Sequence, residues 1–182
     1  MRRFAAVVLF VVAASCALGQ TSGEGAHAAT SAPSAVDRFE PYRFLAGGMW
    51  TAAMQIGNEP GTYDVEYTFE WVLSGKFLQS RHVTKREGKQ LSSTLSMIGW
   101  DAQRQAMAQW GFNNMGMTAV LYAPQTDAPG TLAFEGKLGG GEKAPHVRTT
   151  YVRRGENELE VKTEFLRDGK YTLAGTVTLV RK

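Results

Sequence analysis

The side chains best suited to proton transfer or to orienting a ligand lie around one histidine. His82 stands between Ser80 and Thr84 in a stretch where charged residues alternate with neutral ones. Burying an unpaired charge costs far more than burying a neutral polar group, so Arg81 and Lys85 should face water and His82 the interior. An interior imidazole either hydrogen-bonds hydroxyls or a buried water, or orients the polar head of a ligand in an apolar cavity. Both interpretations stay open.

Other catalytic and metal-binding patterns are weak in this chain of 182 residues. The run 73–75 is not the Gly-x-Ser-x-Gly elbow of nucleophilic hydrolases. The histidines are isolated, no His-x-x-x-His spacing occurs, and the sole cysteine, Cys16, lies near the N-terminus. The glycines at 139–141 are not followed by Lys-Ser or Lys-Thr, so a phosphate loop is not indicated. The sequence therefore assigns no catalytic residue, no metal site and no cofactor.

The N-terminus has the layout of an export signal over residues 1–19, with Arg2 and Arg3 before an uncharged apolar run and small residues after it. That run is shorter than the roughly 20 apolar residues that span a bilayer. Residues 13–16 resemble a lipobox, which would lipidate Cys16, whereas residues 17–19 suit an ordinary signal peptidase. Residues 20–36 predict a flexible tether. We expect an exported protein, periplasmic or lipid-anchored at the bacterial envelope through Cys16.

The charge balance argues against nucleic acid as a partner. The formal net charge is +3, and loss of Arg2 and Arg3 with the signal would nearly neutralise it. Nucleic-acid binding usually needs a basic stripe, but Lys and Arg here are scattered among Glu and Asp. We expect a monomer whose only membrane contact is the anchor.

Strict alternation from Thr62 to Trp71 is the strongest structural signal. Five apolar or aromatic residues alternate with five polar ones, a period of two that predicts a strand between a core and water. Similar segments bounded by turn residues recur to the C-terminus. The predicted strands are 48–57, 62–73, 76–86, 90–100, 104–112, 116–123, 130–137, 146–153, 157–167 and 170–181.

These segments predict an all-β antiparallel meander over residues 37–182, with a short helix before the first strand. An open sheet of about ten strands would leave two unpaired edges, which closure into a barrel removes. A barrel of roughly eight or more strands is wide enough to hold a small ligand.

Several blocks resemble a known family. Residues 44–50 contain the Gly-x-Trp that opens lipocalin-like, calycin-type barrels, and a basic residue stands late in the last strand. With 71–78, 99–101 and 110–116, this block resembles a group of bacterial lipocalin-like domains of unknown function. The resemblance implies a barrel of about ten strands and small-ligand binding, and it carries no established reaction. Haem-binding barrels of the nitrobindin type use a histidine near the last strand, which residues 171–182 lack.

Closure should bring the first and last strands together, so Trp50 and Arg181 are expected to meet and plug one end, with the guanidinium on the indole. Alternation also predicts that Tyr171, Leu173, Val177 and Leu179 form one inner row. The residues expected to line a ligand are Tyr67, Phe69, Trp71, His82, Trp110 and Tyr151.

The function that these observations favour is an exported barrel that binds a small apolar molecule, with no catalysis required. One alternative is a barrel enzyme of isomerase, cyclase or hydrolase type that uses His82 as its acid or base. Another is a lipid-anchored structural or interaction protein whose barrel is filled by its own side chains.

Overall fold

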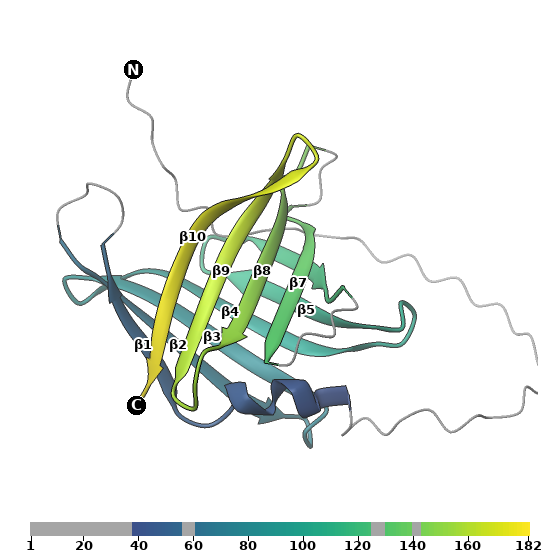
Figure 1. Cartoon of the computed structure of the whole chain (residues 1–182), viewed down its shortest axis with the longest axis horizontal. Coiled ribbons are helices and arrows are strands. Elements are labelled where there is room, and N and C mark those ends of the chain that lie inside the picture. Colours follow the sequence, from purple (N-terminus) through teal and green to yellow (C-terminus); the bar gives the residue numbers. More distant parts are fainter. Residues whose placement is uncertain (1–37, 56–60, 125–129, 140–142) are drawn as a thin grey trace, which may run out of the picture.

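A computed structural model describes residues 38–55, 61–124, 130–139 and 143–182 (Figure 1). Each strand pairs antiparallel with the next, and the first also pairs with the last, so ten strands close one barrel. The predicted closed meander is confirmed. Its elements are the 3₁₀ helix η1 (Glu40–Leu45) and the strands β1 (Met49–Met54), β2 (Tyr63–Val72), β3 (Phe77–Arg86), β4 (Lys89–Asp101), β5 (Ala106–Asn113), β6 (Thr118–Tyr122), β7 (Thr131–Lys137), β8 (His146–Arg153), β9 (Glu158–Arg167) and β10 (Lys170–Arg181).

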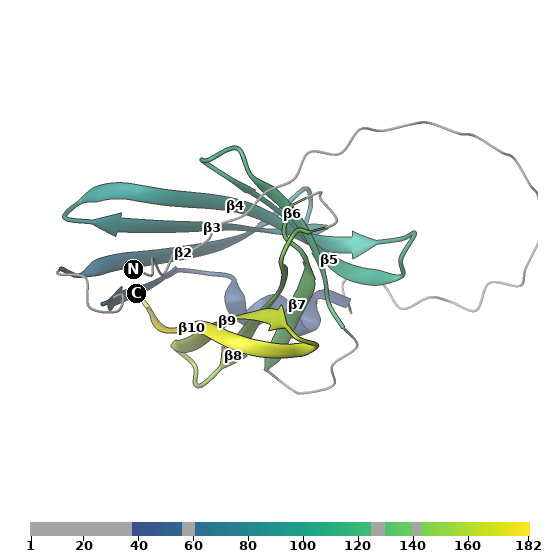
Figure 2. The same ribbon diagram turned by 90° about the horizontal axis from the view of Figure 1, so that it is seen from above.

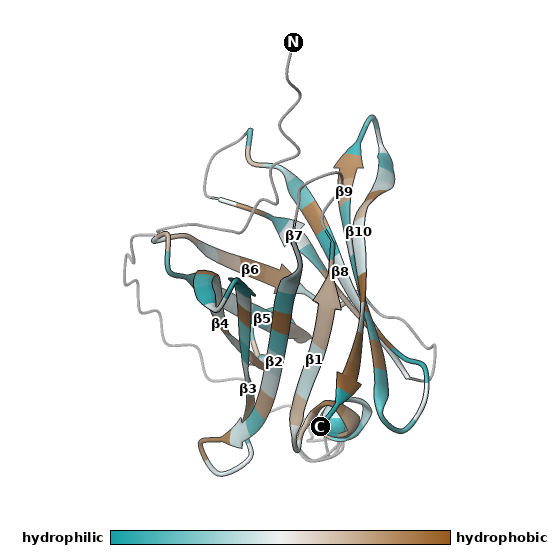
Figure 3. Cartoon of the chain, turned by 90° about the vertical axis from the view of Figure 1, so that its left-hand side faces the viewer, coloured by the Kyte–Doolittle hydropathy of each residue, from teal (hydrophilic) through white to brown (hydrophobic). Residues whose placement is uncertain are grey.

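Alternation explains the strands. In β2, Val65 and Phe69 are buried while Asp64 and Glu70 are exposed, as a strand with one face in a core requires. Bands of opposite hydropathy follow one another along the strands in Figure 3. β2 begins and ends within one residue of its predicted bounds, because the period of two is unbroken there.

Helix η1 closes one end of the barrel, which we call the closed end. It lies across the foot of the strands in Figure 1, and the view from above places it between the β2–β4 wall and the β8–β10 wall (Figure 2). Tyr42 and Leu45 of η1 are buried. The ring centroids of Tyr42 and Phe134 of β7 are 6.0 Å apart. Those of Phe39, which precedes the helix, and Trp71 of β2 are 5.3 Å apart. The helix and its N-cap residue therefore contact opposite walls of the barrel.

The other end, where the hairpins β1–β2, β3–β4, β5–β6, β7–β8 and β9–β10 turn, is called the open end. Ten antiparallel strands joined in sequence order place alternate turns at opposite ends. Residues 56–60 and 140–142, which belong to two of these connections, lie outside the described residues.

Two contacts complete the ring. β1 meets β10 through only two register pairs, Trp50 with Arg181 and Thr51 with Val180. β6 meets β7 through the pair of Tyr122 with Glu135 and an isolated bridge beside it. Gly136 permits the second contact, because a Cβ there would lie 2.7 Å from the Val120 carbonyl oxygen.

A bulge in β10 corrects the predicted inner row. The register with β9 shifts between Leu173 and Gly175, so the strand reverses its faces there. Leu179 points inward and is fully buried, whereas Leu173 is 58% exposed. Tyr171 and Leu173 therefore lie on the outer face, contrary to the prediction from simple alternation.

Candidate ligand site in the barrel interior

Trp50 and Arg181 meet at the closed end, with the guanidinium over the indole as the sequence predicts. Trp50 is fully buried, and its indole Nε1 donates a hydrogen bond of 2.9 Å to the Leu45 carbonyl. The Arg181 guanidinium carbon lies 4.3 Å from the centroid of the Trp50 ring, and its Nη2 donates to the Phe44 carbonyl. This contact joins β1, β10 and η1, so this end of the barrel serves packing.

Three of the predicted ligand-lining rings pack in the closed half of the barrel. Phe69 and Tyr151 are buried, with ring centroids 6.1 Å apart in an edge-to-face arrangement. Trp71 lies closer to η1, against Phe39. Phe134, which the sequence analysis did not identify, is fully buried and lies 6.4 Å from Tyr151. These rings form an apolar floor above the plug.

His82 and Tyr67 form a stacked pair above this floor. They are cross-strand neighbours on β3 and β2, with ring centroids 4.3 Å apart and planes inclined by 11°. The His82 Nε2 is 3.2 Å from the Thr84 hydroxyl, one of the partners expected for an interior histidine. Burial lowers the pKa of His82 to about 4, so the imidazole is uncharged at neutral pH. Burial raises the pKa of Tyr67, which keeps the phenol protonated.

The wall beside His82 is polar. Directly paired residues in a sheet point to the same face, so the inward row through Tyr67 and His82 continues to Thr94 and Asn113. The next two rungs between β4 and β5 pair Ser96 with Gly111 and Ile98 with Gln109. We call the four polar residues of these rungs the polar ladder: Thr94, Ser96, Gln109 and Asn113.

Three side chains of the polar ladder have a buried polar atom that lacks a hydrogen-bond partner among the described residues. They are Thr94 Oγ1, Gln109 Oε1 and Asn113 Nδ2. Asn113 Oδ1 accepts bonds of 2.9 Å from the backbone N–H groups of Met115 and Met117, which leaves its amide nitrogen as the unpaired group. The side-chain amide of Gln109 makes one contact, in which Nε2 lies 3.4 Å from the Tyr151 hydroxyl. If the amide were flipped, Oε1 would take that contact and Nε2 would lose it, so one of the two atoms is unpaired in either orientation.

The polar ladder reverses the usual arrangement of polar and apolar faces. Outward positions beside these rungs include accessible apolar side chains, with Leu95 42% exposed and Phe112 48% exposed. Polar side chains normally face water and apolar ones the core, because only the apolar groups gain from burial. β4 and β5 therefore form a polar interior wall at a cost in stability, which makes this wall the candidate site.

This reversal corrects the expectation for Trp110. Trp110 pairs with Met97 and Val120, which share the outer face, whereas its neighbour Gln109 points inward to Tyr151. The Trp110 ring lies 6.3 Å from Phe77 on the outer face. The structure therefore brings together Tyr67, Phe69, His82 and Tyr151 in the interior, and it leaves Trp110 outside.

Charged side chains on inward positions of the described strands stand at the two ends of the barrel. Arg86 lies at the open end, where its Nη1 donates a 3.1 Å hydrogen bond to the Tyr63 hydroxyl. Arg153 and Arg181 lie at the closed end beside Phe44. The rungs of the polar ladder run from the β5–β6 turn toward the closed end, and the inward positions described there are neutral.

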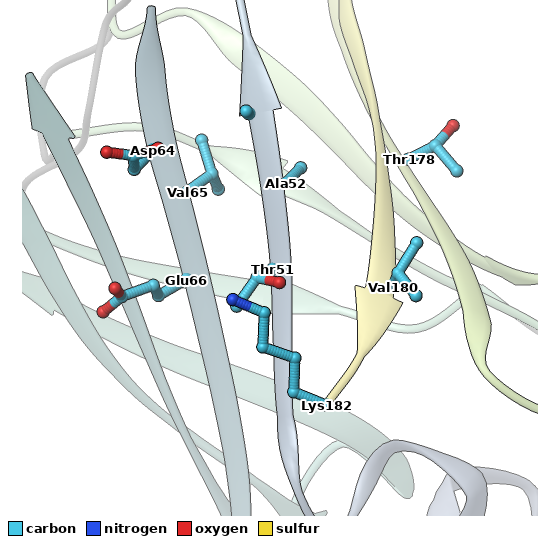
Figure 4. Close-up of a pocket in the computed structure, with 9 residues that line it drawn as sticks. Thr51, Ala52, Asp64, Val65, Glu66, Thr178, Val180 and Lys182 are labelled. Carbon is cyan, nitrogen blue, oxygen red and sulfur yellow. The ribbon is translucent and has the colours of Figure 1, made fainter.

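Two surface grooves lie away from this wall. One, of about 440 Å³, runs where β1 and β10 diverge beyond their two paired rungs (Figure 4). Its lining places Lys182 among small and acidic residues. The other, of about 460 Å³, lies near β6 and β7 and is lined by Arg104, Glu135 and His146 among others. Neither groove is lined by a residue that the sequence predicts for a ligand.

The polar ladder is the feature that sequence reasoning missed. Its signal is the run 92–96, where Ser92, Thr94 and Ser96 occupy every second position. Simple alternation would place those hydroxyls in water, and only the pairing register with β3 shows that they face inward.

Within the described residues no group of three His, Cys, Asp or Glu side chains could hold a metal ion. The described part of the chain also contains no helix long and apolar enough to cross a membrane. Cys16, the signal at 1–19 and the tether at 20–36 lie outside the described residues and stay predictions. A scan against protein-family models finds no match, and a search of curated proteins also finds none.

Proposed function

We propose that this protein is an exported carrier that binds a small molecule inside the barrel, against the wall formed by β2–β5. The observation that supports this function best is the polar ladder, whose buried atoms lack partners inside a closed barrel. Buried polar groups are almost always hydrogen-bonded, and each unpaired one costs roughly 1–3 kcal/mol. A ligand that pairs with these atoms would recover that cost. A lipocalin-like ancestry, which the Gly-x-Trp block and the closed barrel suggest, agrees with this proposal.

The interior offers two environments to such a ligand. Phe69, Tyr151 and Phe134 present apolar rings in the closed half, and the polar ladder lies along one wall. Pockets that combine apolar lining with a few placed polar groups are typical of small-molecule sites. We propose that the apolar body of the ligand lies on the rings, with Tyr67 and His82 beside its polar end.

The pKa and the hydrogen-bond partner of His82 both argue against the enzymatic alternative. An efficient general base has a pKa near the working pH, whereas burial lowers the pKa of His82 to about 4. Its Nε2 also lies within hydrogen-bonding distance of Thr84. We therefore propose that His82 packs and orients, and that binding requires no proton transfer.

Native mass spectrometry of the mature protein purified from its own host tests the carrier directly. The expected result is an additional bound mass that organic extraction removes. A titration with the neutral fluorophore N-phenyl-1-naphthylamine then measures access to the interior. The mass of the mature N-terminus determines whether Cys16 is lipidated or removed.

A blocking variant identifies the site. Gly111 pairs with Ser96 in the middle rung, and a Cβ there meets only Ser96 Oγ, at 3.3 Å. Gly111→Leu should fill the interior beside the ladder and abolish fluorophore binding while the fold is retained. Phe112→Leu, on the outer face of the same strand, is the matched control and should bind as the parent does. A parent protein that yields no bound mass and binds no fluorophore would refute the carrier and favour a filled barrel.

A further inference from the structure

We infer that the ligand is an electrically neutral molecule with a hydrogen-bond acceptor on its polar head, which binds between Thr94 and Asn113 at the polar ladder. This inference rests on the proposed carrier function and specifies the chemistry of its ligand. It follows from the charges and from the unpaired atoms of the interior.

The charge distribution excludes an ionised head at this place. The row that contains Thr94 and Asn113 also contains Tyr67 and His82, and the inward positions of the neighbouring rungs are neutral. Arg86 stands four residues along β3 from His82, about 13 Å at roughly 3.3 Å per residue. A carboxylate or ammonium would thus be buried without a counter-charge, which is far more costly than burying a neutral polar group.

The unpaired atoms define what the head must offer. Asn113 Nδ2 is a donor, because Oδ1 of the same amide already accepts two backbone hydrogen bonds. The ligand must therefore provide an acceptor. Thr94 is directly paired with Asn113, and its hydroxyl can donate or accept. A hydroxyl, amide or ester group meets these requirements, whereas an ammonium, which has no acceptor, does not.

The reversal of faces in β4 and β5 makes this arrangement specific. A barrel stabilised only by its core would place Leu95 and Phe112 inward and the hydroxyls outward. The chain does the opposite and leaves these apolar side chains 42% and 48% exposed. A polar wall of this kind gives a hydrogen-bonding ligand an advantage over a purely apolar one, because an apolar molecule would leave the same atoms unpaired.

Four probes with ten-carbon chains test the inference on the mature protein: decan-1-ol, decanamide, decanoate and decylammonium. Each is used at pH 7.5 to displace N-phenyl-1-naphthylamine. Decan-1-ol and decanamide should displace the fluorophore at concentrations about tenfold lower than the two ions, or lower still, because the ions remain charged when buried. Equal or tighter binding of decanoate or decylammonium would overturn the inference.

A conservative substitution locates the head. Thr94→Val retains the shape of the side chain and removes the hydroxyl, so decanamide should bind about 3- to 10-fold more weakly, the effect of one net hydrogen bond. Thr68→Val, on the outer face of β2 beside Met49, is the matched control and should change nothing. Asn113 is left intact because it also holds the β5–β6 turn.

The outcomes separate the two proposals. If neither the fluorophore nor any probe binds, the carrier function fails, and the inference fails with it. If the probes bind but the neutral ones have no advantage, or Thr94→Val binds decanamide as the parent does, the carrier stands. In that case water alone occupies the unpaired atoms, and the neutral-head inference is wrong.

Discussion

The Arg181 guanidinium lies 4.3 Å from the centroid of the Trp50 ring, although the two residues belong to the last and the first strand of the barrel. The indole is fully buried and also bonds to the Leu45 carbonyl, so one side chain contacts both strands and η1. The seam between β1 and β10 has only two register pairs, which makes this packing important for closure.

Trp50→Ala should therefore lower the free energy of unfolding by about 3–5 kcal/mol, the range for truncation of a large buried aromatic. Urea denaturation followed by circular dichroism measures this loss. Trp110→Ala, on the partly exposed outer face, serves as control and should lose less than half as much. A loss below about 1 kcal/mol for Trp50→Ala would show that the plug does not stabilise the barrel.

Gly136→Ala should weaken the contact between β6 and β7. The added Cβ would lie 2.7 Å from the Val120 carbonyl oxygen, so the backbone must move, at a cost of about 1–3 kcal/mol. Gly175→Ala is the matched control, since a Cβ there meets nothing within 4 Å, and it should be neutral or slightly stabilising. Thermal melts of the two variants compare the sites, and equal stability would contradict the close approach of β7 to β6.

His82 makes stability depend on pH. Its pKa falls from 6.5 in the unfolded chain to about 4 in the folded protein, because burial disfavours the imidazolium. Between these pH values the unfolded chain binds more protons than the folded protein does. The contribution of His82 to the free energy of unfolding is therefore complete above pH 6.5 and is lost as pH falls toward 4. The loss is on the order of 3 kcal/mol.

Denaturant melts across this pH window measure the slope. His82→Gln should flatten it, whereas His146→Gln, on the outer face, keeps His82 and should keep the slope. An unchanged slope in His82→Gln would mean that other groups cause the acid sensitivity.

The outer cluster around Tyr171 should contribute modestly to stability. The Tyr171 hydroxyl donates a 2.8 Å hydrogen bond to Glu135 and lies 3.1 Å from His146 Nδ1, while the Arg148 guanidinium carbon lies 4.0 Å from the centroid of its ring. Burial and the bond to Glu135 raise the pKa of Tyr171 to about 12, so the phenol remains a donor at neutral pH. Tyr171→Phe should cost about 0.5–1.5 kcal/mol, measured by urea denaturation at pH 7.5. A neutral result would show that water replaces these bonds.

Sequence patterning predicts most of this fold because the barrel obeys a period of two over much of its length. The run 62–73 predicts β2 almost to the residue, and the contact of Trp50 with Arg181 follows from closure of the ring. The charge rule also orients β3 correctly, since Arg81 is exposed and His82 lies on the inner face.

The same reasoning fails in two places with distinct causes. Around Leu173 a bulge inserts one residue and reverses the faces of β10, and a simple period of two ignores Gly175, the residue type that often marks a bulge. In β4 and β5 the polar face is the inner one, so a rule that sends aromatic residues inward misplaces Trp110.

The amino-acid sequence by itself determined that the chain forms alternating strands joined by turns, because side-chain direction in a strand depends only on position along the chain. Only the tertiary structure decided which face of β4 and β5 is interior, because that depends on pairing register with neighbouring strands. Because directly paired residues point to the same face of a sheet, Thr94 faces inward opposite His82, and Asn113 faces inward opposite Thr94. The candidate site exists only once the strands are paired.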